Sequence, residues 1–171
     1  MLRTIMIFPQ FENIEIIDEI RGRYDPLAKL VRPHITLVFP FESEITNDEI
    51  EEKLTSSLKD VRPFELTLHG FSKTDDNYLF LNIEKGKETI EAIHDDLYSN
   101  YFKDYYLPIP YSPHMTVGKL KNAQELNDAY EYVKDLDASF KTVVKKISVE
   151  MIGEHEESII VLEKRLENPD M

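Results

Sequence analysis

The sequence predicts an α+β protein, and three observations support this fold class. Apolar residues make up 42% of the 171 residues, which is enough for a buried core. Helix-like and strand-like patterns alternate along the whole chain, and no Gly/Ser-rich tract separates them. Two pairs of expected strands follow one another without a helix between them. Such strands pair antiparallel, which distinguishes an α+β fold from a doubly wound parallel sheet.

The first half of the chain contains a regular series of elements. We expect a strand, a helix, a strand, a helix and two strands, at residues 3–8, 12–24, 34–41, 46 onward, 64–71 and 78–84. The second helix begins at Thr46, because Glu49 three residues later completes the spacing of a capping box. These assignments place an apolar strand between the two helices.

The second half repeats most of this order. We expect a helix, a strand, a helix and two strands, at residues 87–102, 114–120, 122 onward, 140–152 and 158–163. If the first strand of the chain is set aside, both halves have the order helix, strand, helix, strand, strand. We therefore expect one domain, residues 1–171, made of two pseudo-symmetric lobes at approximately residues 1–85 and 86–171.

Each half also contains the same short motif, in the order Pro, His, apolar, Thr, apolar. The two copies are Pro33–Leu37 and Pro113–Val117, and their histidines lie 114 − 34 = 80 residues apart. A single His-x-Thr on an apolar strand is more often structural than catalytic. Its duplication, with Pro before both copies, makes chance a poor explanation and indicates a shared role for the two copies.

The spacing of the motif places its polar residues together. Side chains of a strand alternate between its faces, so His34 and Thr36 share one face about 6.6 Å apart, as do His114 and Thr116. In the second copy Gly118 continues the same face, and we expect open space there beside the polar pair. Two strands related by pseudo-symmetry would present two imidazoles and two hydroxyls to one cleft.

This set of groups matches the needs of phosphodiester chemistry without a metal or a cofactor. A neutral imidazole can take a proton from the attacking water or hydroxyl, while a protonated one gives a proton to the leaving oxygen. Histidine suits both roles because its pKa lies near neutrality. Each threonine hydroxyl can donate to a non-bridging phosphate oxygen, where charge develops.

The two motifs, with the segment Arg21–Leu27 (RGRYDPL) upstream of the first, resemble the 2H phosphoesterase superfamily, and within it the LigT-like, 2′-5′ RNA ligase group. The resemblance extends over nearly the whole chain. It implies a bilobal fold, with two pseudo-symmetric antiparallel sheets around a central cleft and helices outside. It also implies metal-independent activity on 2′,3′-cyclic phosphates, related cyclic nucleotides or 2′-5′ linkages. The catalytic positions fall on His34, Thr36, His114 and Thr116, with His114 as the base and His34 as the acid.

Charge limits the range of partners. The net charge is −13, with 33 acidic and 20 basic residues, so the surface repels polyanions and extended binding to a duplex is not expected. A small nucleotide, or an RNA end held in a locally positive cleft, is the expected substrate. RNA-active members of the family often have a basic cleft, whereas only Arg32 and Lys119 are adjacent to the motifs here. Lys119 alternates away from the histidine face.

Composition excludes several other classes of protein. The chain has no cysteine, which excludes disulfides, thiolate catalysis and cysteine metal sites. No apolar run approaches the roughly 20 residues that span a bilayer, and the first residues do not form a secretory signal, so we expect a cytoplasmic protein with no membrane partner.

Two other functions remain open at this stage. The chain could be a non-catalytic module that binds a nucleotide or an RNA end, or a 2′-5′ RNA ligase, which runs the same chemistry in reverse. The other histidines, His69, His94 and His155, are interpreted as structural. Tyr105, Tyr106 and Tyr111 precede the second motif and are expected to pack, although an aromatic ring there could also stack on a base.

Overall fold

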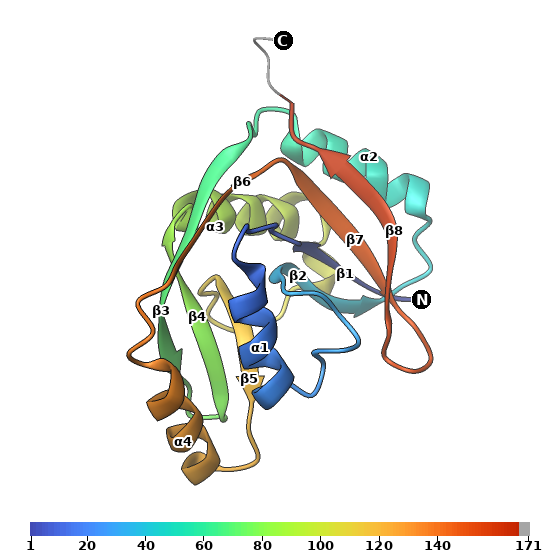
Figure 1. Cartoon of the computed structure of the whole chain (residues 1–171). Helices are drawn as coiled ribbons and strands as arrows, with labels where there is room; N and C mark the ends of the chain where they lie inside the picture. The colour runs from blue at the N-terminus through green and yellow to red at the C-terminus, as the bar shows by residue number, and fades with distance from the viewer. Residues whose placement is uncertain (168–171) are drawn as a thin grey trace.

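The computed structural model describes residues 1–167, which form two four-stranded antiparallel sheets (Figure 1). The first sheet has the order β2-β1-β7-β8, with β1 Leu2–Ile7, β2 Ile35–Glu42, β7 Lys146–Ile152 and β8 Ser158–Arg165. The second has the order β5-β4-β3-β6, with β3 Phe64–Lys73, β4 Tyr78–Lys85, β5 His114–Lys119 and β6 Ser139–Val144. The predicted α+β class with antiparallel sheets is confirmed.

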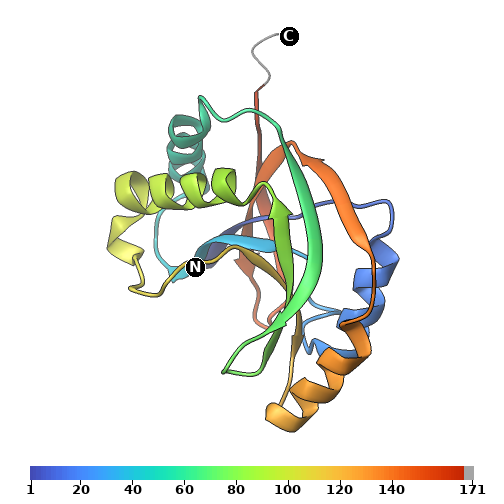
Figure 2. The ribbon, with the colours of Figure 1, turned by 90° about the vertical axis from the view of Figure 1, so that its left-hand side faces the viewer.

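In the described part of the chain, four α-helices cover the sheets from outside. They are α1 Ile14–Tyr24, α2 Asn47–Leu58, α3 Lys87–Asp96 and α4 Ala123–Val133. Figure 2 shows α2 and α3 on one side of the molecule and α1 and α4 on the other. The helix expected over residues 87–102 is regular only as far as Asp96, after which a π-turn, Leu97–Tyr101, and a 3-10 turn, Lys103–Tyr105, complete the segment. Within residues 1–167, no helix has both the length and the apolar character that a membrane crossing requires.

The internal repeat begins one strand earlier than the sequence pattern suggests. The series β1, α1, β2, α2, β3 is matched in order by β4, α3, β5, α4 and the β6–β7 segment. In each of these two series the first two strands lie in one sheet and the last strand lies in the other. The last strand of the first series, β3, pairs with β4, and the last strand of the second series, β7, pairs with β1. The expected boundary near residue 85 therefore does not separate the two sheets. It lies between β4 and α3, and each sheet contains strands from both halves.

One expected strand, over residues 140–152, is in fact two. β6 pairs with β3 in the second sheet, whereas β7 pairs with β1 and β8 in the first, and Lys145 lies between them. The chain changes sheets at this residue. Apolar residues continue through the break, which is why the sequence pattern indicated a single strand.

A single hydrophobic cluster joins the sheets to all four helices. It includes the apolar faces predicted for the helices, such as Ile50 and Leu54 of α2 and Leu126 of α4. At the start of α2 the expected capping box is present: the Thr46 hydroxyl accepts from the Glu49 N–H at 3.1 Å, and the Glu49 carboxylate accepts from the Thr46 N–H at 2.7 Å. These local signals therefore fix the helices that support the motif strands.

Candidate active site

The two motif strands occupy equivalent positions in the two sheets. β2 is an edge strand of the first sheet, β5 is an edge strand of the second, and the two strands contact each other. His34 lies directly before β2 and His114 begins β5. The structure therefore brings together the two strands that carry the predicted site residues, although they are 80 residues apart in the sequence.

Burial follows the same alternation in both copies. His34, Thr36, His114 and Thr116 are partly exposed, whereas the residues before and between them are buried. The buried apolar residues, Ile35, Leu37, Met115 and Val117, are all 0% exposed. The prediction that the apolar half of the motif anchors the strand in the core is confirmed.

Both strands also contain a register shift one residue after the threonine. In β2, Thr36 pairs with Met6 but Val38 already pairs with Ile5, so Leu37 is an extra residue. In β5, Val117 is extra in the same way, between Thr116 and Gly118. A bulge of this kind reverses the alternation of the side chains that follow it.

The bulge overturns one expectation about the second copy. Gly118 is buried, and a Cβ atom added to it would lie 3.0 Å from the Cβ of Tyr24 and 3.2 Å from the Cβ of Leu79. The space beside Thr116 that the simple alternation predicted is therefore filled. Gly118 instead allows α1, which carries Tyr24, to pack closely on β5.

The two imidazoles make identical backbone contacts. Nδ1 of His34 lies 2.8 Å from the carbonyl oxygen of Arg32, and Nδ1 of His114 lies 2.8 Å from that of Ser112. A carbonyl oxygen only accepts hydrogen bonds, so each Nδ1 carries the hydrogen and donates it. Each ring thereby keeps Nε2 as the nitrogen that can exchange a proton with a ligand.

Burial lowers the pKa of both histidines. It is the largest cause in each case, and the hydrogen bond from Nδ1 partly opposes it. The pKa of His34 is lowered further by the positive charges of Arg21 and His114, while Asp25 raises it. Both shifts favour the neutral imidazole in the free protein, whereas an anion nearby would favour the protonated form.

The aromatic surroundings of the two rings differ. His114 stacks on Phe80, with ring centroids 3.5 Å apart and planes 14° apart. His34 has a looser neighbour in Phe8, at 6.1 Å and 58°. The two copies of the motif are therefore equivalent in backbone position but not in environment, which permits different roles for the two histidines.

The upstream RGRYDPL segment forms a buried ion pair near His34. Nε of Arg21 lies 3.0 Å from a carboxylate oxygen of Asp25, and both side chains are almost fully buried. Asp25 also accepts a hydrogen bond from the backbone N–H of Leu27 at 2.9 Å. This segment fixes the connection from α1 toward the first motif.

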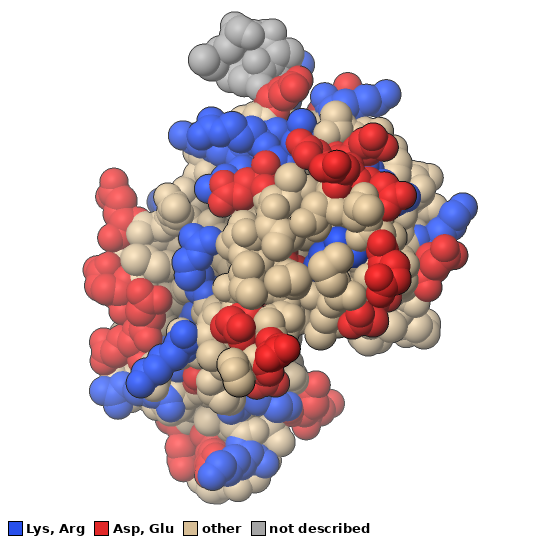
Figure 3. Space-filling view, turned by 90° about the vertical axis from the view of Figure 1, so that its right-hand side faces the viewer, with Lys and Arg blue, Asp and Glu red and all other residues tan. Residues whose placement is uncertain are grey.

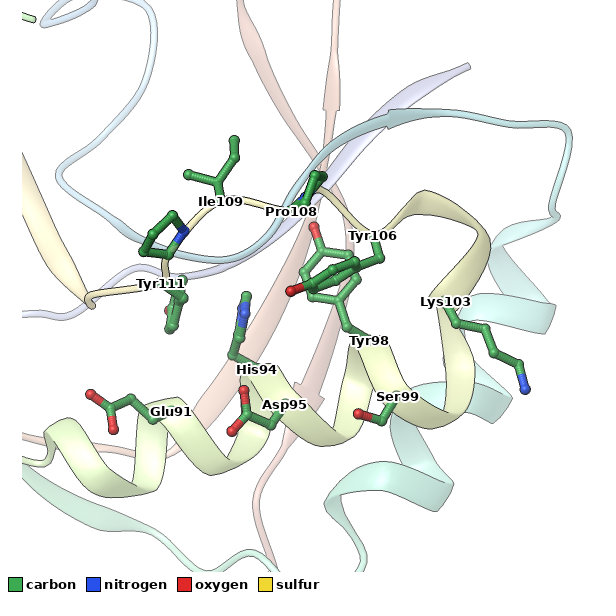
Figure 4. A pocket seen from close by; sticks show the side chains of 11 residues that line it. Glu91, His94, Asp95, Tyr98, Ser99, Lys103, Tyr106, Pro108, Ile109 and Tyr111 are labelled. Carbon is green, nitrogen blue, oxygen red and sulfur yellow. The ribbon is translucent and has the colours of Figure 1, made fainter.

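Side chains from the second half hold the free edge of β2. The Tyr111 hydroxyl donates to the carbonyl oxygen of Thr36 at 2.6 Å, and Nδ1 of His94 lies 2.7 Å from that of Leu37. The N–H of Phe39 donates to the Tyr98 hydroxyl at 2.9 Å. His94 and Tyr111 stack at 3.5 Å with planes 2° apart, and Figure 4 shows them side by side at the wall of a cavity of about 840 Å³.

These contacts go beyond the packing role predicted for Tyr111. It lies three residues before His114 and bonds to Thr36 of the other copy, so it links the two motifs directly. Burial raises the pKa of its hydroxyl, which therefore stays protonated as a donor. The sequence contained only one indication of this role, which is that Tyr111 is an aromatic residue close to the second motif.

The remaining histidines have structural surroundings. His94 is buried, and Nδ1 of His69 lies 3.2 Å from the carbonyl oxygen of Ala138, while His155 is in an exposed turn. Over residues 1–167, histidine, aspartate and glutamate side chains form no group of three or more that could hold a metal ion.

Solved structures share the fold of this chain. The fold is that of LigT-like phosphoesterases: Escherichia coli LigT complexed with 3′-AMP has a TM-score of 0.67 and 16% identity, with 97% of this chain and 98% of that chain covered. LigT complexed with ATP has a TM-score of 0.62 and 18% identity, with 98% of both chains covered. At these identities the likeness concerns the fold.

The sequence comparisons identify the family. Residues 8–155 match the 2′-5′ RNA ligase superfamily. A Bacillus licheniformis protein, provisionally named a phosphoesterase, is 30% identical over 147 residues, which cover 83% of this chain and 85% of that protein. A Geobacillus kaustophilus protein with the same provisional name is 28% identical over 153 residues, with 83% of each chain covered. The chain belongs to the 2′-5′ RNA ligase superfamily, which confirms the resemblance carried by its motifs.

Proposed function

We propose that the protein is a metal-independent phosphoesterase that hydrolyses cyclic phosphodiesters of the 2′,3′-cyclic phosphate type, on a nucleotide or on an RNA end. The observation that carries the proposal is the pair of His-x-Thr motifs on edge strands in contact, each with Nδ1 bonded to a carbonyl and Nε2 left for proton exchange. The nucleotides in the LigT complexes, ATP and 3′-AMP, support a nucleotide substrate.

In the proposed reaction the two histidines act on opposite sides of the phosphorus. Nε2 of His114, the base implied by the family resemblance, takes a proton from water as the water oxygen attacks phosphorus. The bond to one ribose oxygen breaks, and that oxygen receives a proton from Nε2 of His34. The hydroxyls of Thr36 and Thr116 donate to the non-bridging oxygens, whose charge increases in the transition state. The product is a phosphomonoester beside a free ribose hydroxyl.

Turnover of a panel of 2′,3′-cyclic mononucleotides in excess EDTA tests the proposal. We expect hydrolysis that EDTA does not reduce. If the folded protein binds these nucleotides without turning them over, the proposal fails in favour of a non-catalytic binding module. A ligase that forms 2′-5′ linkages must hold two RNA ends, and the net charge of −13 opposes the binding of two polyanions.

The pH dependence of kcat/KM follows from the lowered pKa values of the two histidines. Catalysis by the free protein needs one neutral and one protonated imidazole, and this state is most populated near the pKa values. Because burial lowers both pKa values, we expect the maximum below about pH 6.5, the usual pKa of histidine. Above it the acid loses its proton, so kcat/KM should fall by about tenfold per pH unit. A maximum above pH 7 would contradict this account.

Replacement of Tyr111 tests the link between the two motifs. Tyr111→Phe keeps the ring stacked on His94 but removes the donor to Thr36. We expect kcat to fall by roughly tenfold with little change in KM, because small displacements of catalytic groups are costly. Tyr106→Phe, at an exposed tyrosine of the same loop, is the matched control. An unchanged kcat for Tyr111→Phe would show that this hydrogen bond does not position the site.

A further inference from the structure

A row of side chains leads away from His34 across the first sheet. Residues opposite one another on neighbouring strands point to the same face. Lys146 of β7 pairs with Arg165 of β8, and the register of β1 and β7, continued by two residues, places Phe8 opposite Lys146. The Phe8 ring in turn lies 6.1 Å from the His34 ring. The row therefore runs from His34 through Phe8 and Lys146 to Arg165.

The row ends in a cavity with a cationic wall. This cavity has a volume of about 370 Å³, and Phe8, Lys145, Lys146 and Arg165 all line it. Lys146 is paired with Glu163, at 3.0 Å. In the part of the chain that the structure describes, Lys145 and Arg165 form no ion pair, so their charges are available to an anion.

A further cation lies against the Phe8 ring. The guanidinium carbon of Arg32 is 4.5 Å from the centre of the Phe8 ring, and the carbonyl oxygen of Arg32 binds His34. Figure 3 shows a patch of Lys and Arg side chains at the upper left of the molecule, with acidic groups beside it and over much of the rest of that face. In a protein with a net charge of −13, such a group favours an anionic ligand locally.

The distance from His34 to this cavity suggests what the anion is. Neighbouring strands are about 4.8 Å apart, so β7 and β8 lie roughly 10 and 14 Å from β2. A phosphate held between His34 and His114 cannot reach that far. A second phosphate on the same substrate molecule, separated from the first by a ribose, extends toward Phe8, where the cavity begins, and the long side chains of Lys145 and Arg165 can cover the remaining distance.

We infer that the cavity lined by Lys145, Lys146 and Arg165 binds a second phosphate group of the substrate. This inference rests on the proposed function and narrows its substrate class. The substrate would carry a phosphate on the 5′ side of the nucleoside whose cyclic phosphate is opened. That group is either the phosphodiester of an RNA 3′ end or the 5′-phosphate of a free nucleotide.

Three substrates and one double variant test the inference. The substrates are adenosine 2′,3′-cyclic phosphate, the same compound with a 5′-phosphate, and a diadenosine dinucleotide that ends in a 2′,3′-cyclic phosphate. For the protein itself we expect kcat/KM to be about tenfold higher for one or both of the substrates with a second phosphate. Lys145→Gln/Arg165→Gln should remove this advantage, mainly through KM, and leave the first substrate unaffected. Lys121→Gln, at an exposed lysine between β5 and α4, is the control for loss of a positive charge outside the cavity.

The outcomes separate this inference from the proposed function. An advantage for the dinucleotide alone supports the inference with an RNA end as the source of the phosphate, and an equal advantage for the 5′-phosphorylated nucleotide supports it with a free nucleotide. Hydrolysis of all three substrates at equal rates, or an equal loss with Lys121→Gln, overturns the inference and leaves the proposed function intact. Hydrolysis of none of the three counts against the proposed function.

Discussion

Replacement of His34 or His114 by alanine is expected to lower kcat/KM for a 2′,3′-cyclic nucleotide by about 10²- to 10⁴-fold in each case. This is the range that one general acid or base contributes. Both side chains are partly exposed, and their main polar contact is a carbonyl two residues earlier, so their removal should leave the core intact. Steady-state kinetics at several pH values measures the loss and shows which limb of the pH profile each variant removes.

His155→Ala is the matched control for these variants. His155 lies in an exposed turn and forms no part of the candidate site, so its replacement should change kcat/KM by less than twofold. Circular dichroism melts establish that all three variants are folded. If a folded His34→Ala or His114→Ala protein hydrolysed the substrate at the rate of the original protein, the acid and base roles proposed here would be wrong.

The second large effect concerns the threonines. Thr36→Val and Thr116→Val keep the branched shape that suits a strand but remove the hydroxyl that would donate to the phosphate. Loss of one donor aimed at developing charge costs about 10²- to 10³-fold in kcat, and we expect a reduction of this order for each variant. We expect the loss to appear in kcat, because the hydroxyls stabilise the transition state, and separate measurement of kcat and KM checks this.

Serine substitutions distinguish lost chemistry from disturbed packing. Thr36→Ser and Thr116→Ser restore a hydroxyl without the methyl group, and they should recover most of the activity that valine removes. Thr55→Val, at an exposed position on α2, should leave kcat unchanged. Equal losses for the valine and serine variants would indicate that the threonines support the strand and do not contact the phosphate.

The features that the sequence predicted correctly depend on short-range patterns. The alternation along Pro33–Leu37 and Pro113–Val117 depends on strand geometry alone, and so the shared burial pattern of the two copies could be predicted. The capping box at Thr46 is likewise complete within four residues. The family resemblance then supplied the arrangement of the two copies, which local pattern could not give.

The features that could not be predicted depend on pairing between distant strands. The exchange of β3 and β7 between sheets moves Lys146 and Arg165 to the face that carries His34, more than 100 residues earlier in the chain. Considered in sequence, the motifs had few cations near them. The bulge at Val117 is also invisible locally, because it appears only when β5 is aligned with β4, and it explains why Gly118 is packed instead of open.

The central claim is that the two motifs form one active site, and the His34→Ala/His114→Ala double variant tests it most directly. When two groups act as a unit in one reaction, the loss from removing both is close to the loss from removing either. We predict that the double variant has nearly the same kcat/KM as the less active of the two single variants, with EDTA present throughout. Losses that multiply, so that the double variant falls by the product of the two single effects, would contradict a single paired-histidine site.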